Sequence, residues 1–188
     1  MVQSFVYHMV PREIKGDRLI PLNSLKEAHP NLYNEYSKKY FDQPERTELL
    51  TRQIPKLNCL WNDVLHFLPL HPYYVYEALT SLGIKTKENQ LFFKIPIEKL
   101  KNNKNAYYFY TKEKYRGPAE DIEEDEIKLL DIEDYKEIKG IPRETFEYYK
   151  IQNERGNRYG LFPFIPHLFS NGEVEIRNVG LITWNRLE

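Results

Sequence analysis

The chain has 188 residues, 41% of them hydrophobic, which is enough to bury the core of one domain. Its 27 basic and 28 acidic residues leave a net charge of −1, so no global positive field attracts nucleic acid or an acidic membrane. The single cysteine, Cys59, excludes an intrachain disulfide and a cysteine-based zinc site.

The first half of the chain is predicted to alternate strands and helices. Residues 3–10 form an apolar strand that Pro11 closes. After Ser24, apolar residues recur every three or four positions, which predicts a helix that Pro30 divides into two pieces. These positions are Leu25, Ala28, Leu32, Tyr36 and Tyr40. The next expected elements are a helix over 45–53, a strand over 64–68, and a helix over 72–82 that Gly83 ends.

The second half is predicted to contain more strands than helices. Strands are expected over 91–97 and 106–111, and one or two more within 162–184. The acid-rich segment 119–138 is more typical of a solvated loop or the start of a helix than of a metal site, and a helix is expected over 144–154. The mixture predicts a single domain (1–188) of the α+β class, with an antiparallel or split sheet.

The late segment Gly172–Ile176 (GEVEI) carries two glutamates two residues apart. In a strand Glu173 and Glu175 point the same way, while Val174 faces the core. Paired carboxylates repel each other, so a cleft that stabilises a cationic intermediate would explain them. The alternative is the solvent face of an edge strand, where charges discourage pairing with another chain.

Three segments of the chain resemble the ADP-ribosyltransferase fold family, especially its DNA-modifying toxins and their uncharacterised relatives. They are the first strand Val6–Val10 (VYHMV), the central segment Val64–Tyr74 (VLHFLPLHPYY), and the late segment Gly172–Val179 (GEVEIRNV). The resemblance implies a split antiparallel or mixed sheet around a central cleft, with several short helices. It also implies transfer of ADP-ribose from nicotinamide–adenine dinucleotide (NAD) to a nucleic-acid or protein acceptor.

The same resemblance implies roles for individual residues. His8 would bind the adenosine-side ribose of NAD. One of Glu173 and Glu175 would hold the nicotinamide ribose and stabilise its cationic transition state, and the other would orient the acceptor. An aromatic ring would stack on the nicotinamide. The candidate rings are Tyr73, Tyr74 and those of the 107–110 strand, including Tyr108. Arg46 and Arg52 are candidates for phosphate binding, since guanidinium forks match phosphate.

Two other function classes fit the same sequence. One is a non-enzymatic protein-binding module whose aromatic groove is anchored by Trp61, Tyr73 and Tyr74. The other is a metal-dependent nuclease or hydrolase that uses Asp63, His66 and His71, although their spacing matches no common ligand motif. His167 is the additional ligand considered for that enzyme. With no signal peptide and no apolar run of transmembrane length, we expect a cytoplasmic protein that contacts no membrane.

Overall fold

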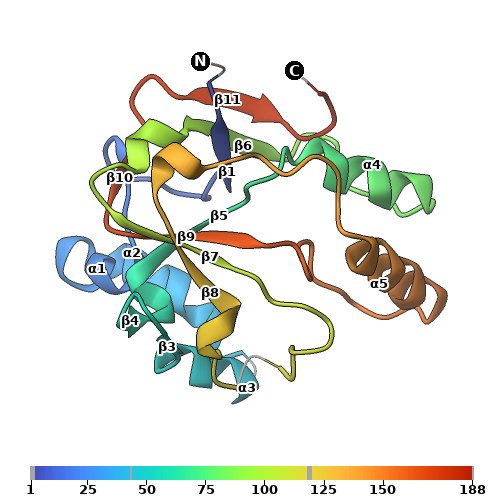
Figure 1. Cartoon of the computed structure of the whole chain (residues 1–188), viewed down its shortest axis with the longest axis horizontal. Helices are drawn as coiled ribbons and strands as arrows, with labels where there is room; N and C mark the ends of the chain where they lie inside the picture. The colour runs from blue at the N-terminus through green and yellow to red at the C-terminus, as the bar shows by residue number, and fades with distance from the viewer. Residues whose placement is uncertain (1–2, 43, 118–119, 188) are drawn as a thin grey trace.

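The computed structural model describes residues 3–42, 44–117 and 120–187. In this part of the chain the longer strands form two antiparallel sheets, with the orders β1-β6-β11 and β5-β9-β7-β8 (Figure 1). The first sheet consists of β1 (Phe5–Met9), β6 (Leu91–Pro96) and β11 (Gly180–Thr183). The second consists of β5 (Val64–Phe67), β9 (His167–Asn171), β7 (Lys104–Tyr108) and β8 (Ile127–Leu130).

The two sheets are joined where β1 passes the end of β5. Tyr7 and Leu68 exchange both of their backbone hydrogen bonds, at N···O distances of 2.9 and 2.8 Å. In the first sheet His8 lies opposite Phe93 of β6. In the second sheet His66 lies opposite Phe169 of β9. The strand that carries His8 is therefore held beside the strand that carries His66.

Two short ladders complete the strand pairing. β2 (Arg18–Leu19) pairs with β10 (Val174–Glu175), so the first loop of the chain lies beside the Glu-x-Glu segment. β3 (Gln53–Ile54) pairs with β4 (Cys59–Leu60) as a hairpin. These ladders fix the positions of the charged and aromatic residues that line the cavities described below.

The helices lie at two opposite sides of the strands (Figure 1). On one side are α1 (Leu22–Ala28) and α2 (Pro30–Ser37), and on the other are α4 (Tyr73–Ser81) and α5 (Arg143–Glu154); α3 (Pro44–Thr47) is a single turn. Short 3₁₀ turns connect several elements: η1 (Lys38–Tyr40), η2 (Glu48–Leu50), η3 (Trp61–Asp63), η4 (Ile97–Leu100), η5 (Glu124–Glu126) and η6 (Ile132–Asp134).

Local sequence explains the helix limits. Pro30 occupies the first turn of α2, where its missing N–H costs nothing, but it cannot continue α1. The chain therefore breaks at His29, as predicted. Gly83 has φ +71°, a conformation that glycine adopts without the Cβ penalty, and it follows the last turn of α4.

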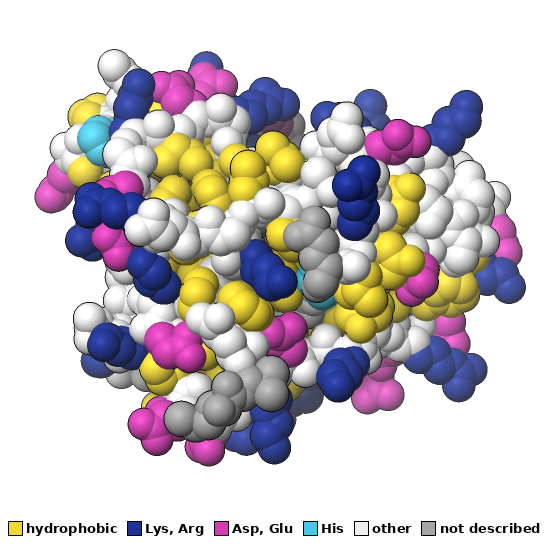
Figure 2. All heavy atoms as spheres, turned by 90° about the horizontal axis from the view of Figure 1, so that it is seen from above, with side chains coloured by type: hydrophobic (Ala, Val, Ile, Leu, Met, Phe, Trp, Pro, Cys, Tyr) yellow, Lys and Arg dark blue, Asp and Glu magenta, His cyan; other side chains and the backbone are white. Residues whose placement is uncertain are grey.

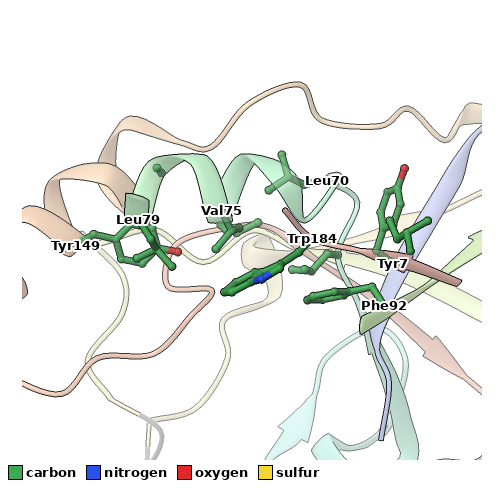
Figure 3. Close-up of a cluster of buried hydrophobic side chains, with 11 residues drawn as sticks. Tyr7, Leu70, Val75, Leu79, Phe92, Tyr149 and Trp184 are labelled. Atoms are coloured by element: carbon green, nitrogen blue, oxygen red, sulfur yellow. The ribbon is translucent and has the colours of Figure 1, made fainter. Parts of the chain in front are cut away.

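The largest buried cluster connects the first sheet with α4 and α5. Phe92 of β6 and Trp184, which follows β11, lie beside Val75 and Leu79 of α4 and Tyr149 of α5 (Figure 3). Phe92 and Tyr149 are fully buried. The apolar face of α4 thus packs on the sheet and on α5 together, which fixes both helices against the strands.

The α+β class and the antiparallel pairing are confirmed, and several element limits differ from the prediction. The helix expected over 45–53 is only α3 followed by η2, because the chain turns into β3 at Gln53. The acid-rich segment, expected to be a loop or the start of a helix, contains the predominantly apolar strand β8 (IKLL). The Glu-x-Glu segment, expected as one strand, is extended only at Val174–Glu175.

Charges of both signs are interspersed on the surface. On the face seen in Figure 2, basic and acidic side chains alternate around patches of hydrophobic side chains. The mixture agrees with the net charge of −1 and gives this face no field of a single sign. No helix formed by residues 3–42, 44–117 and 120–187 is long and apolar enough to cross a bilayer.

Candidate functional site

A large groove, here called the His8 groove, lies between the end of β1 and the helices α1 and α2. It is lined by His8 and Met9, by residues 10–15 and 18–20 of the following segment, by side chains of α1, α2 and η1, and by residues 61, 62 and 64–66. Its volume is about 1260 Å³. Pockets for drug-sized ligands measure roughly 300–1,000 Å³, so this groove has room for an elongated ligand.

His8 contributes a neutral imidazole to the groove. Its ring packs edge-on against Phe67 of the neighbouring β5 at 5.5 Å, and burial lowers the pKa of His8 to about 4. Nδ1 lies 2.7 Å from the backbone oxygen of Met9, so this nitrogen carries the proton. The other ring nitrogen, Nε2, is consequently an acceptor at neutral pH. A ligand hydroxyl is the natural donor to it.

Four basic residues line the His8 groove: Arg12, Lys15, Arg18 and Lys39. Two of them are paired, Lys15 with Glu13 at 2.7 Å and Arg18 with Glu173 at 3.6 Å. Among the ion pairs formed by the described residues, none involves Arg12 or Lys39. Burial and the neighbouring Arg46 lower the pKa of Lys39. Three acids, Glu13, Glu35 and Asp42, line the groove as well, and Lys38 and, to a smaller extent, Arg12 lower the pKa of Glu35. Arg12 and Lys39 are therefore the cations of the groove that remain outside ion pairs in this part of the chain and could meet an anionic ligand.

The two glutamates of the Glu-x-Glu segment pair with different cations. Glu173 is exposed, and Arg18, its partner at 3.6 Å, lines the His8 groove. Glu175 pairs instead with Lys99 of η4 at 2.8 Å, and this hydrogen bond lowers the pKa of Glu175. The mutual repulsion expected of the two carboxylates is therefore offset on both. Glu173 is the glutamate connected to the groove.

The predicted aromatic residues lie elsewhere. Tyr73 and Tyr74 lie on α4, where the Tyr73 hydroxyl bonds Glu77 at 3.3 Å and Tyr74 packs against the core cluster of Figure 3. Tyr108 is buried in β7 and lines a second, smaller cavity. Tyr73, Tyr74 and Tyr108 do not line the His8 groove. Trp61, which was expected to anchor a protein-binding groove together with Tyr73 and Tyr74, does line it.

The structure does not bring the residues of the metal-enzyme alternative together. Both carboxylate oxygens of Asp63 accept hydrogen bonds at 2.7 Å, from the Asn23 side chain and the Leu60 N–H. His66 bonds the backbone of Trp61, while the buried His71 packs on Tyr7 in the other sheet. Within the described part of the chain, no group of three or more His, Cys, Asp or Glu could hold a metal ion. The described residues therefore give no support to a metal-dependent hydrolase built on Asp63, His66 and His71.

Sequence reasoning missed the residues that connect the glutamates to the groove. Arg18 belongs to a two-residue strand in a loop expected to be irregular, and its pairing with β10 spans the length of the chain. The alternation of Arg18 (exposed) and Leu19 (buried) was the only available signal, and it covers two residues. Lys39 lies in η1 next to Tyr40, the last position of the predicted apolar stripe, but nothing in that spacing indicated a groove.

We expect stability to fall as the solution is acidified below about pH 6.5. Burial lowers the pKa of His8 to about 4, of His66 to about 3 and of His167 to about 4. The unfolded chain, with histidine pKa values near 6.5, then binds more protons than the folded chain between about pH 6.5 and 4. Each of the three histidines should contribute at most about 1.4 kcal/mol per pH unit to the slope of the unfolding free energy against pH.

Urea unfolding at a series of pH values measures this slope. His66→Phe, which removes one titrating ring but keeps an aromatic ring beside Trp61 and Phe169, should reduce it. An unfolding free energy that is unchanged between pH 6.5 and 4.5 would contradict the prediction.

Comparison with known proteins identifies no family for the chain. No family model, no curated protein and no solved structure matches it. A function for the chain therefore has to be argued from the groove and its charged residues.

Proposed function

We propose that the chain is an ADP-ribosyltransferase-like enzyme that binds NAD in the His8 groove and transfers its ADP-ribose to a nucleic-acid or protein acceptor. One observation carries the proposal. His8 lines the groove, and Glu173 is ion-paired with Arg18, which lines the same groove. These two residues come from the first and last of the three segments that resemble the transferase family.

The size and charge of the groove support a dinucleotide. NAD is an elongated anion with a pyrophosphate between two riboses. The groove has a volume of about 1260 Å³, and Arg12 and Lys39 are among the residues that line it. These two cations are without ion pairs among the described residues. Arginine and lysine side chains both bind phosphate oxygens through charge-assisted hydrogen bonds.

The protonation state of His8 supports the role that the resemblance assigns to it. A neutral imidazole whose Nδ1 donates to Met9 presents Nε2 as an acceptor. Ribose hydroxyls are donors, so Nε2 would accept a hydrogen bond from the adenosine-side ribose. A protonated histidine could not accept this bond. The burial that keeps His8 neutral at pH 7 is therefore part of the proposed recognition.

Glu173 would act at the nicotinamide ribose. In the proposed step the bond between ribose C1 and the nicotinamide nitrogen breaks, and its electron pair leaves with neutral nicotinamide. The ribose becomes oxocarbenium-like, and a nearby carboxylate stabilises this positive charge. An oxygen or nitrogen of the acceptor then bonds to C1 and loses its proton to solvent or to a carboxylate. We assign the stabilising role to Glu173 and not Glu175, because Arg18, the partner of Glu173, lines the groove, whereas Lys99, the partner of Glu175, does not.

The arrangement of the strands is compatible with the proposal. The resemblance implies a split sheet around a central cleft, and the described strands form two antiparallel sheets joined at Tyr7 and Leu68. The nicotinamide-stacking aromatic must then be one that lines the groove, such as Tyr36, Tyr40 or Trp61. Tyr73, Tyr74 and Tyr108 are not proposed for this role.

Thermal unfolding with and without NAD tests binding. At a free NAD concentration about 100 times its dissociation constant, a ligand that binds only the folded state adds about 2.7 kcal/mol, which raises the melting temperature by several degrees. His8→Phe keeps the ring packed on Phe67 but removes the acceptor, and should reduce the shift. Glu147→Gln, which removes one partner of an ion pair on α5 outside the groove, is the control.

Release of nicotinamide tests the reaction separately from binding. Glu173→Gln should keep the thermal shift and lower nicotinamide release at least about 100-fold, as expected when a group that stabilises transition-state charge is lost. Glu175→Gln should reduce release much less. A wild-type protein whose melting temperature is unchanged by millimolar NAD would overturn the proposed function.

A further inference from the structure

A second cavity, here called the Arg52 pocket, shares Trp61 with the lining of the His8 groove. It measures about 420 Å³. Its walls are mostly aromatic and include Tyr108, Tyr110, Tyr115, Tyr148, Phe162 and Phe164. Trp61 lines both cavities, so they are neighbours. This volume is near the lower end of the roughly 300–1,000 Å³ range of small-molecule pockets and suits a single-ring ligand.

Arg52 brings a buried charge to this pocket. The residue is only 7% exposed, and it immediately precedes β3, directly across the hairpin from Trp61. The Trp61 N–H donates to the Arg52 carbonyl at 2.8 Å, and the guanidinium lies 5.0 Å from the centre of the Trp61 ring. The hairpin thus fixes both the position of the guanidinium and the aromatic surface on which it rests.

Arg52 is not paired directly with an acid in the described part of the chain. No ion pair there involves Arg52, and its Nε has no hydrogen-bond partner. Burial raises the pKa of Tyr108 to about 12, and the Tyr108 hydroxyl is a neutral partner of the guanidinium. A buried guanidinium without a carboxylate is costly, so an anionic ligand would gain from binding there.

Arg52 is the only source of charge among the residues that line the pocket. Burial lowers the pKa of His167 to about 4, so its ring is neutral at pH 7. Among the residues that line the pocket, Arg52 is the only one that is charged at that pH. The pocket therefore combines one cation with aromatic walls, so a suitable ligand has both a negative charge and an aromatic surface.

We propose that the Arg52 pocket binds a planar aromatic ring that carries one carboxylate. The carboxylate would accept hydrogen bonds from the Arg52 fork, including its unpartnered Nε. The ring would lie among the tyrosine and phenylalanine side chains, where stacked and edge-on contacts stabilise it. This inference shares only Trp61, which lines both cavities, with the residues considered for NAD, and it does not depend on the proposed transferase reaction.

Four probes test the two halves of the proposal on the wild-type protein. Isothermal titration calorimetry with benzoate should show binding, and benzamide, which has the same ring without the charge, should bind at least about tenfold more weakly. Cyclohexanecarboxylate keeps the charge but loses the flat ring, and it should also bind more weakly. Acetate, which has the charge alone, should show no measurable binding.

Two arginine variants locate the site. Arg52→Met replaces the buried charge by an apolar side chain of similar length, so the fold is expected to be retained. Benzoate affinity should fall at least about tenfold, which corresponds to about 1.4 kcal/mol. Arg143→Met is the control, because Arg143 is exposed on α5 and pairs with Glu147 outside the pocket; it should leave benzoate binding unchanged.

Tryptophan fluorescence gives a second readout, from a residue in the wall of the pocket. The chain has two tryptophans, and in Trp184→Phe the remaining Trp61 lines the pocket. Benzoate should change its emission. Equal affinities for benzoate and benzamide, or full benzoate binding by folded Arg52→Met, would overturn the proposal, as would the absence of benzoate binding to the wild-type protein.

Discussion

Replacing Phe92 by alanine is expected to lower the free energy of unfolding by about 3–5 kcal/mol. Phe92 is fully buried in β6, the middle strand of its sheet. Its ring stacks on Trp184 and meets Phe162 edge-on, each at 6.4 Å between ring centres (Figure 3). The truncation leaves a cavity that neither β1 nor β11 can fill, because both strands are held by their hydrogen bonds to β6.

Urea unfolding followed by circular dichroism measures this loss. Because domains are typically stable by only about 5–15 kcal/mol, the variant should melt at a much lower temperature. Phe41→Ala is the matched control, since Phe41 is 65% exposed and its loss should change stability by less than about 0.5 kcal/mol. Equal effects of the two substitutions would show that the buried cluster does not carry the stability assigned to it.

The second large effect is expected for Gly172→Ala, directly before the Glu-x-Glu segment. Gly172 has φ +139°, and a Cβ added there would collide with Asn103 Oδ1. The Asn103 amide donates to Ser170 Oγ at 2.9 Å and to the Glu173 carbonyl at 3.2 Å. A methyl group therefore has to displace the side chain that ties Glu173 to β9.

We expect Gly172→Ala to cost about 2–4 kcal/mol. Backbone strain at such a φ contributes about 1–3 kcal/mol, and the disturbed hydrogen bonds contribute about 1 kcal/mol more. Thermal unfolding measures the cost. Gly160→Ala is the control, because Gly160 is exposed and an added Cβ there meets no atom within 4 Å. If the two glycine variants melt at the same temperature, the close approach of Asn103 is not structurally important.

The Gly172 variant also tests the proposed function. If Glu173 acts on the nicotinamide ribose, a shift of its backbone should lower nicotinamide release in the variant that remains folded. NAD binding should be less affected, because His8 and Lys39 belong to other elements. If the variant loses NAD binding but releases as much nicotinamide per bound NAD as the wild type, then Gly172 affects the recognition of NAD and not the reaction.

Several local elements of this protein could be predicted from the sequence. Apolar spacing after Ser24, together with Pro30, defines the two helices α1 and α2, and Gly83 marks the end of α4. These signals are local: a proline cannot continue a helix, and an apolar repeat of 3.6 residues is visible within about 11–18 consecutive residues. The first strand, which carries His8, was also predictable, because the residues around His8 are apolar or aromatic.

The contacts between distant residues follow from the tertiary structure and could not be predicted from the sequence. Arg18 reaches Glu173 only because β2 pairs with β10 at the other end of the chain, and a two-residue strand carries no periodic signal. Tyr73 and Tyr108 were equivalent as sequence candidates, but one lies on α4 and the other lines the Arg52 pocket. The buried charge of Arg52 arises from side chains that fold around it, so no spacing of residues near position 52 could have revealed it.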